Sequence, residues 1–175
     1  MERSTELYEK LIEPVQDRMI GVVTRIIRDH DDAMDVFQEV LAVIWRKLKV
    51  IDRHPHPDAY IMRICVTRSY DALRKKARRR MQVRLEKDIE KLKRRSRTSD
   101  AATLLTIREA IALLPPKQGK TVLLRLIEGE DFASIGSVLG CSAVTARSHF
   151  SKGKAQLRSV LAEAGISPKG VRNES

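Results

Sequence analysis

Residues 131–161 read DFASIGSVLGCSAVTARSHFSKGKAQLRSVL, and this stretch predicts two helices joined by a tight turn. Asp131 is placed to cap a short helix that runs up to Gly140, because a side-chain oxygen at this position accepts from the free amides of the first turn. Ser142 is placed to cap a longer helix that ends at about residue 164. A short helix, a turn of about three residues and a longer helix form the helix-turn-helix pattern.

The longer helix has two different faces. Its apolar stripe, spaced as a core-facing helix requires, is Ala146, Phe150, Gly153, Leu157 and Val160. The opposite face carries Thr145, Ser148, His149, Ser151 and Lys152, with Arg147 and Lys154 at its flanks. Such side chains contact base edges and phosphates from a recognition helix. The spacing alone also fits an ordinary amphipathic helix with a solvated polar face, so this alternative stays open.

The rest of the chain also shows helical spacing, and no strand-like alternation lasts long enough to indicate a sheet. The expected helical segments are 7–48, with a distinct helix at about 32–48, then 58 to about 80, 104–114 and 116–128. Asp58 is the expected N-cap of the third segment, because HPHP at 54–57 cannot continue a helix. We therefore expect an all-α fold of two small helical domains joined by a flexible linker.

The composition indicates a polyanionic partner. The chain has 175 residues, with 34 Lys and Arg against 23 Asp and Glu, a formal net charge of +11 and only 4% aromatic residues. A basic excess of this size favours nucleic acid or an acidic membrane surface. The N-terminal sequence lacks the apolar core of a signal peptide, and the longest charge-free run, 132–146, is too short to span a bilayer. We expect a cytoplasmic protein without membrane insertion.

No pattern for catalysis, metal binding or a cofactor survives inspection. Cys65 and Cys141 lie far apart in unrelated contexts, so each is expected to behave as a small buried apolar residue. The sequence has no Gly-rich phosphate loop and no supported grouping of His, Asp and Ser. His54 and His56 suggest a metal site, but a stiff loop is the better interpretation. The expectation is a protein that is not an enzyme and that needs no cofactor.

A second basic feature lies at the end of the third helical segment. Residues 74–80 read RKKARRR, six cations in seven positions. A charge run is often only a solvated face, but Arg63, Thr67 and Tyr70 lie on one side of the same helix. An aromatic ring and hydroxyls among cations suit unpaired bases, which need a stacking surface as well as charge. The helix is therefore a candidate for binding single-stranded DNA.

Several segments, taken in order, resemble the sigma-70 superfamily of RNA polymerase sigma factors. Residues 35–46, DVFQEVLAVIWR, are similar to the polymerase-binding segment of region 2, and residues 63–74, RICVTRSYDALR, to the segment that melts and reads the −10 element. Residues 109–118, EAIALLPPKQ, with 122–129, VLLRLIEG, and 135–161 resemble region 4, which reads the −35 element. We expect a connector too short for the intervening domain of larger sigma factors and no further domain before region 2. Both features match the extracytoplasmic-function type.

The resemblance implies region 2 at 1–80, a charged linker at 81–103, region 4 at 104–165 and a tail at 166–175. It implies that the protein binds bacterial RNA polymerase core, the single-stranded −10 element and the duplex −35 element, and supports promoter opening and transcription initiation. Small sigma factors of this type often have an anti-sigma factor, which would cover the surfaces used for polymerase.

The same resemblance assigns residues to each surface. The expected polymerase-binding residues are Asp35, Gln38, Glu39, Ala42, Trp45 and Arg46. The expected −10 residues are Arg53, Arg63, Thr67, Tyr70, Arg74, Lys75, Arg78 and Arg79. The expected −35 residues are Ser142, Thr145, Arg147, Ser148, His149, Ser151 and Lys152.

The chain departs from the family at a few positions. The family commonly has Asn where Thr67 stands and Arg where His149 stands, which affects the promoter sequence rather than the class. Gly136 and Gly153 stand where Ala is usual, and each costs about 1 kcal/mol of helix propensity unless close packing requires it.

Three other classes of protein compete with a sigma factor. A two-domain helix-turn-helix regulator without polymerase contacts is the main alternative. A membrane-surface protein is disfavoured because the apolar face beside the basic run is ordinary. A structural RNA-binding protein is disfavoured because the chain lacks an aromatic-rich sheet.

Overall fold

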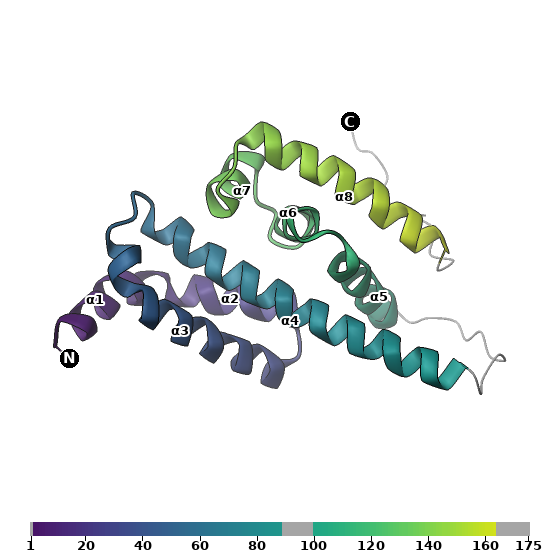
Figure 1. Ribbon diagram of the computed structural model, residues 1–175, viewed down its shortest axis with the longest axis horizontal. Coiled ribbons are helices and arrows are strands. Elements are labelled where there is room, and N and C mark those ends of the chain that lie inside the picture. Colours follow the sequence, from purple (N-terminus) through teal and green to yellow (C-terminus); the bar gives the residue numbers. More distant parts are fainter. Residues whose placement is uncertain (1, 89–99, 164–175) are drawn as a thin grey trace.

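The computed structural model describes residues 2–88 and 100–163, and every regular element within these ranges is a helix (Figure 1). The elements are α1 (Glu2–Ile12), the 3-10 turn η1 (Glu13–Val15), α2 (Gln16–Ile27), α3 (His30–Asp52), α4 (Pro57–Asp88), α5 (Asp100–Leu113), α6 (Pro116–Leu126), α7 (Phe132–Leu139) and α8 (Ala143–Glu163). The predicted all-α class is confirmed. Much of the expected linker and the whole expected tail lie outside the described residues.

α3 begins at the acidic run that precedes it. The carboxylate of Asp29 accepts from the backbone amide of Asp32 at 3.0 Å and so caps the helix. Asp31 and Asp32 in the first turn add negative charge at the positive end of the helix dipole. The helix ends at Asp52, about one turn later than the sequence predicts, and Ile51 in that last turn is buried.

α4 differs from the prediction at both ends. It begins at Pro57, which suits a first helical position because proline has no amide to leave unpaired. The expectation that Asp58 caps this helix is therefore wrong, and Asp58 lies in the first turn. The helix also continues past Arg80 to Asp88, through residues that are mostly good helix formers.

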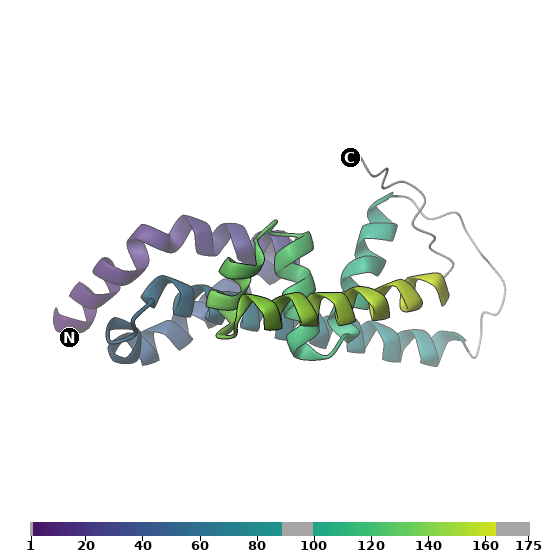
Figure 2. The same ribbon diagram turned by 90° about the horizontal axis from the view of Figure 1, so that it is seen from above.

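α4 is the central element of the molecule (Figures 1 and 2). α2 and α3 pack against one side of it, and α5, α6 and α7 pack against the other. Buried side chains from both sides, among them Ile26, Val40, Tyr70 and Ile111, belong to one continuous apolar cluster. The two halves of the chain are thus packed together along α4.

α7 and α8 form the helix-turn-helix unit that residues 131–161 predict. The carboxylate of Asp131 accepts from the Ser134 amide at 2.7 Å, and Ser142 Oγ accepts from the Thr145 amide at 3.1 Å, so both predicted caps are confirmed. Gly140 in the turn has a φ of +70°, a conformation that favours glycine.

Close packing explains the two unusual glycines. A Cβ on Gly136 would lie 2.6 Å from the carbonyl oxygen of Cys141 in the turn. A Cβ on Gly153 would lie 2.7 Å from Val122 Cγ2 of α6. Both positions therefore require glycine. At position 136 a Cβ would clash with the backbone, and at position 153 it would clash with a side chain.

The prediction of a buried apolar stripe on α8 is wrong for one residue. Ala146, Gly153 and Leu157 are buried and Phe150 is half-buried, but Val160 is 36% exposed. A stripe with an average spacing of 3.5 residues drifts around an ideal α-helix by about 20° in every seven residues. The last member of the stripe therefore turns toward solvent.

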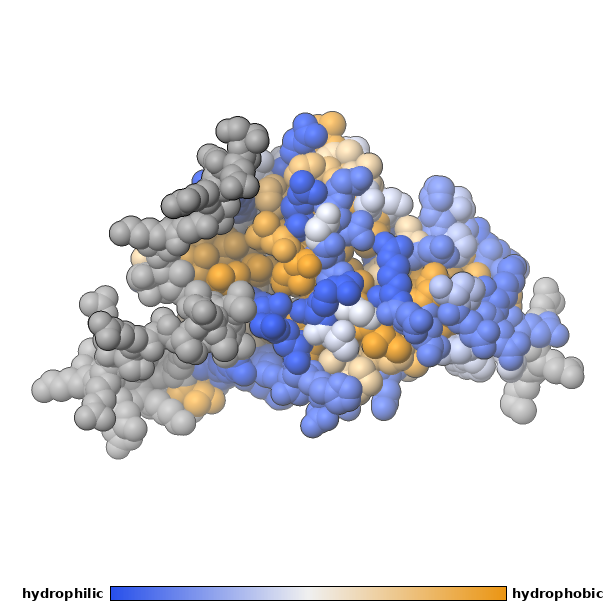
Figure 3. Space-filling view, turned by 180° about the vertical axis from the view of Figure 1, so that it is seen from behind, coloured by the Kyte–Doolittle hydropathy of each residue, from blue (hydrophilic) through white to orange (hydrophobic). Residues whose placement is uncertain are grey.

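Hydrophilic side chains cover much of the face in Figure 3, with apolar areas between them.

Across residues 2–88 and 100–163, no helix is both long enough and apolar enough to cross a membrane.

We expect Gly136→Ala to lower the free energy of unfolding by about 1–3 kcal/mol, the usual cost of overpacking. The reason is that its Cβ meets a backbone carbonyl, a contact that outweighs the gain of about 1 kcal/mol in helix propensity. Urea unfolding measures the change, with Ser137→Ala, an exposed neighbour on α7, as the control. A stability that stays the same or rises in Gly136→Ala would contradict this account.

Candidate nucleic-acid interface

The start of α8 presents the polar residues that the sequence predicts for the −35 element. Six of them are exposed, and His149 is half-buried; the exposed ones are Ser142, Thr145, Arg147, Ser148, Ser151 and Lys152. Ser142 has a structural task as well, because its hydroxyl caps α8 and lies 2.8 Å from the Thr145 hydroxyl. The structure thus gathers the predicted set along the first turns of one helix.

An aromatic pair supports Arg147. Its guanidinium lies 5.4 Å from the centroid of the Phe132 ring, within the range of a cation–π contact. Phe132 meets Phe150 edge-on, with 5.6 Å between ring centroids. These ring contacts therefore support the Arg147 side chain near the start of α8.

Val144 is a candidate residue that sequence reasoning missed. It lies at the second position of α8 and is 79% exposed, although it is apolar. An apolar side chain at this place can contact the methyl group of thymine in the major groove. The signal was present in the sequence, because Val144 precedes the buried Ala146 by two residues and so lies off the apolar stripe.

The face of α3 predicted to bind polymerase is open to solvent. Trp45 is 49% exposed, and the remaining members are exposed as well: Asp35, Gln38, Glu39, Ala42 and Arg46. The helical spacing places Val36, Phe37, Val40 and Leu41 on the opposite, buried side of this helix. The first three are buried as expected, whereas Leu41 is only half-buried. The Trp45 ring contacts that of Tyr8 in α1, with centroids 5.8 Å apart. The aromatic margin of this face is therefore shared between α3 and α1.

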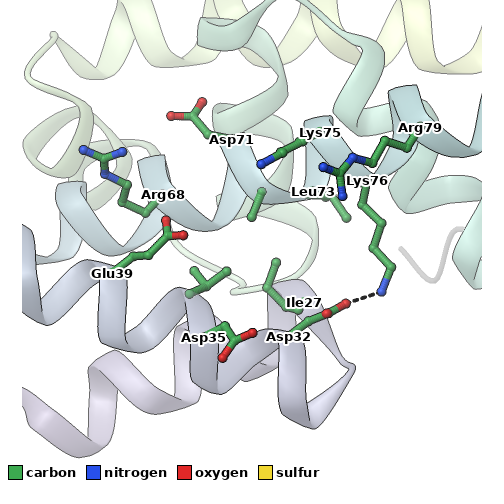
Figure 4. A pocket seen from close by; sticks show the side chains of 12 residues that line it. Ile27, Asp32, Asp35, Glu39, Arg68, Asp71, Leu73, Lys75, Lys76 and Arg79 are labelled. Carbon is green, nitrogen blue, oxygen red and sulfur yellow. Dashed lines mark hydrogen bonds and ion pairs between the residues drawn. The ribbon is translucent and has the colours of Figure 1, made fainter.

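A groove of about 390 Å³ lies on the surface where α3 and α4 pack together (Figure 4). Asp35 and Glu39 line its α3 wall, and Arg68, Lys75 and Arg79 line its α4 wall. The polymerase-binding and −10 residues were expected to form separate sites. In the structure, members of the two sets face each other across one groove. An acidic wall thus faces a basic wall.

The face of α4 predicted to hold unstacked bases is covered, not open. α5, α6 and α7 pack against this helix. Arg63 Nε donates to the carbonyl oxygen of Val138 at 2.7 Å. Lys120 Nζ lies 3.4 Å from Thr67 Oγ1, to which it donates. The predicted base-contacting side chains therefore make contacts within the chain.

Tyr70 is the most deeply placed of these residues, with 0% of its surface exposed. Its hydroxyl donates to the carbonyl oxygen of Leu114 at 2.7 Å. Its ring lies against Gly119, where a Cβ would stand 2.3 Å from the Tyr70 hydroxyl oxygen. Burial raises the pKa of the Tyr70 phenol to about 12, and the nearby guanidinium of Arg74 acts in the opposite direction. Only glycine at position 119 allows this close approach.

Ion pairs join α2 and α4 to the second half of the chain. The pairs and their shortest distances are Arg25–Glu128 at 2.5 Å, Arg18–Glu130 at 3.2 Å and Arg80–Glu109 at 2.9 Å. The Glu128 side chain is only 3% exposed, and its hydrogen bonds raise the pKa of Arg25. Carboxylates of the second half therefore neutralise cations of the first half.

The other predicted −10 cations remain accessible, with one exception. Arg53, Lys75, Arg78 and Arg79 are exposed. Arg74 is half-buried, and its buried Nε has no hydrogen-bond partner among the described residues. The structure therefore divides the predicted −10 set into a covered part around Tyr70 and an open cationic part.

The loop at 54–57 is held by its own contacts. His54 Nδ1 accepts from the His56 amide at 3.1 Å, and its ring packs on Tyr60 with centroids 5.0 Å apart. These contacts favour the stiff-loop interpretation. No group of three or more His, Cys, Asp or Glu within the described ranges is placed to hold a metal ion. Burial raises the pKa of the Cys65 thiol to about 12, which keeps it protonated.

Two segments of the chain match known sequence families. Residues 11–79 match the family described as Sigma-70 region 2, and residues 104–157 match Sigma-70, region 4. The two matches follow one another in this order and take in most of the chain.

Named relatives and a solved structure are also similar to the chain. It is 25% identical over 167 residues to the RNA polymerase sigma-E factor of Streptomyces coelicolor, covering 95% of this chain and 93% of the relative. It is 26% identical over 161 residues to the ECF RNA polymerase sigma factor SigE of Mycolicibacterium smegmatis, covering 89% and 62%. The sigma factor RpoE in complex with the anti-sigma factor NepR from Bartonella quintana aligns with a TM-score of 0.49 and 17% identity, over 89% of this chain and 96% of that one.

We expect the Tyr70 phenol to ionise only near pH 12, because burial opposes its charge. The ordinary value is about 10, so the raised pKa favours the folded chain below pH 10. This contribution is lost as the pH rises from about 10 through about 12. Tyrosinate absorbance, taken as the difference between the wild type and Tyr70→Phe, measures the midpoint. A midpoint near 10 in the folded chain would contradict the burial of this ring.

Proposed function

The chain belongs to the sigma-70 family of RNA polymerase sigma factors, of the extracytoplasmic-function type, and from that premise we propose how its surfaces share the work of transcription initiation. A sigma factor binds polymerase core and directs it to promoter DNA. The phosphodiester chemistry belongs to the polymerase, and this chain supplies recognition. A protein with these two partners acts beside the chromosome, so we place it in the cytoplasm.

The open face of α3 is the surface we assign to polymerase core. The observation that carries this assignment is that Asp35, Gln38 and Glu39 are exposed while the other side of the same helix is buried in the region 2 core. Carboxylate and amide groups on a helix face suit a basic helical partner, and Trp45 at the margin adds apolar area. An anti-sigma factor, where one exists, would compete for the same face.

The α4 helix is the surface we assign to the −10 element. The exposed cations Lys75, Arg78 and Arg79 suit the phosphate backbone, whose contacts position DNA without reading its sequence. Arg63, Thr67 and Tyr70 have the donors and the ring that unstacked bases need, although contacts within the chain cover them in this structure. Unstacking costs a few kcal/mol per step, and contacts of this kind offset it.

The N-terminal turns of α8 are the surface we assign to the duplex −35 element. Exposed Thr145, Arg147 and Ser148 lie where recognition helices reach base edges in the major groove. Ser151 and Lys152 follow one turn later and suit phosphate contacts. The alternative function is a helix-turn-helix regulator without polymerase contacts. It does not explain the exposed acidic face of α3. Co-purification of the full chain with polymerase core separates the two classes.

We expect the double substitution Gln38→Ala and Glu39→Ala to weaken binding to polymerase core by at least about tenfold, or roughly 1.4 kcal/mol. Both side chains are exposed, so the helical content and the unfolding free energy should stay unchanged. A matched control removes one amide and one carboxylate from another exposed helix face, with Gln156→Ala and Glu163→Ala in α8. Unchanged affinity for core in the first variant would contradict the assignment of this face.

We expect substitutions in α8 and α4 to fail on different DNA states. Arg147→Ala should cost about 1–3 kcal/mol in −35 preference and should leave binding to a premelted −10 bubble intact. Tyr70→Ala should keep duplex −35 binding and should lose promoter opening, which a premelted bubble partly restores. The measurement uses holoenzyme on a promoter that the wild type transcribes, in duplex and mismatched forms, with a fluorescent base analogue. Identical failure of both variants on both templates would contradict this division.

A further inference from the structure

One aromatic ring of the helix-turn-helix unit contacts both neighbouring helices. Phe132 is the first residue of α7, directly after the cap residue Asp131, and it is half-buried. Its ring lies against Arg125 from α6 and against Arg147 and Phe150 from α8. The three helices pack against one another in region 4 (Figure 1). Phe132 therefore connects the start of α7 to a residue of the recognition helix.

Two of these neighbours fix the position of the Phe132 ring. Phe150 meets it edge-on, with 5.6 Å between ring centroids. The guanidinium of Arg125 lies 5.1 Å from the centroid of the Phe132 ring. Arg125 is itself anchored, because its Nη1 donates to the carbonyl oxygen of Glu130 at 2.8 Å. The ring is thus supported from α6 and from α8, and it offers a fixed surface to a further cation.

Arg147 lies against this ring with its hydrogen-bond donors unused. Its guanidinium is 5.4 Å from the ring centroid, and within residues 2–88 and 100–163 it makes no hydrogen bond or ion pair. A carboxylate partner would occupy the N–H groups of the guanidinium, whereas a ring attracts the cation through its π face. The planar group can therefore be oriented by Phe132 and still offer two parallel donors to a base, as arginine does to O6 and N7 of guanine.

We propose that Phe132 is a positioning residue for −35 recognition, which holds the guanidinium of Arg147 in the orientation that reads a base. An exposed arginine loses rotamer freedom when it binds, and this loss lowers affinity. The ring restricts the side chain in the free chain, so less freedom is lost on DNA. The proposal rests on the −35 assignment of α8 made above, and it adds a specificity residue that lies outside the recognition helix.

Three variants of α7 separate the ring from the packing around it. Phe132→Leu removes the π face and keeps an apolar side chain, whereas Phe132→Tyr keeps the ring. The matched control is Leu139→Ala, which removes a half-buried apolar side chain from the other end of α7. Both Phe132→Leu and Leu139→Ala lose apolar packing, but only the first loses the contact with Arg147.

The first experiment uses the full chain without DNA or polymerase. The Nε–Hε resonance of Arg147, assigned by NMR as the signal that Arg147→Lys removes, should carry a ring-current shift from Phe132. We expect Phe132→Leu to move this resonance toward the position of an unstructured arginine. Phe132→Tyr and Leu139→Ala should leave it close to its wild-type position. An unmoved resonance in Phe132→Leu would overturn the claim that the ring holds Arg147.

The second experiment measures base preference at each −35 position. Holoenzyme made with each variant selects from a pool of single-base variants of a promoter that the wild type transcribes, and sequencing gives the preferences. Arg147→Ala identifies the positions that Arg147 reads. Phe132→Leu should lower the preference at those same positions by about two- to fivefold, the range of an exposed cation–π contact. Phe132→Tyr should retain most of the preference, and Leu139→Ala should change no position selectively.

A double-mutant cycle tests whether Phe132 acts through Arg147. The effect of Phe132→Leu on preference is measured again in the Arg147→Ala background, where it should disappear because the ring has no guanidinium left to hold. An effect of the same size in both backgrounds would mean that the ring contacts DNA directly or only supports the fold, and would overturn the proposal.

The remaining outcomes separate this proposal from the −35 assignment. A preference that is unchanged in Phe132→Leu, or lowered equally at every position, would overturn the positioning role. If Arg147→Ala itself leaves every preference unchanged, the assignment of Arg147 to the −35 element has failed and the proposal fails with it. The Arg147 resonance distinguishes this case, because it still moves in Phe132→Leu if the ring holds the guanidinium.

Discussion

The arrangement of this sigma factor depends on the burial of one tyrosine between its two halves. The hydroxyl of Tyr70 donates to the Leu114 carbonyl, and its ring fills the space that Gly119 leaves open. Because α4 belongs to region 2 and Gly119 to region 4, this contact helps to make one core out of two expected domains. The positions of α5, α6 and α7 on α4, and hence the covering of Arg63 and Thr67, follow from the same packing.

Electrostatics decides which parts of the basic surface stay open. Glu109, Glu128 and Glu130 neutralise cations of the first half, and burial of the Glu128 carboxylate makes its pairing with Arg25 necessary. Among the described residues, Lys75 and Arg79 have no such carboxylate partner, and they face the acidic wall of α3 across a groove. The net charge of +11 therefore favours binding to DNA, while the fold determines which cations can reach the DNA.

The helix-turn-helix unit could be predicted nearly residue by residue because its determinants are local. Caps at Asp131 and Ser142 bond to amides three residues away, and Gly140 adopts its positive φ within the turn. The open polar face of α3 could be predicted for the same reason, since side chains four residues apart share a face. Two predictions were wrong. Asp58 is not the cap of α4, because Pro57 takes the first position of that helix. Val160 is not buried, because the apolar stripe drifts around α8.

The sequence by itself determined the helices, their buried stripes, the order of the two family regions and the polar face of the recognition helix. Only the tertiary structure decided that Tyr70, Arg63 and Thr67 are covered, and that acidic α3 and basic α4 share a groove. These features join residues that lie far apart in the sequence, such as Tyr70 and Leu114 at 44 positions, or Arg63 and Val138 at 75. Periodicity fixes which way a side chain points from its own helix, but not which distant helix fills the space in front of it.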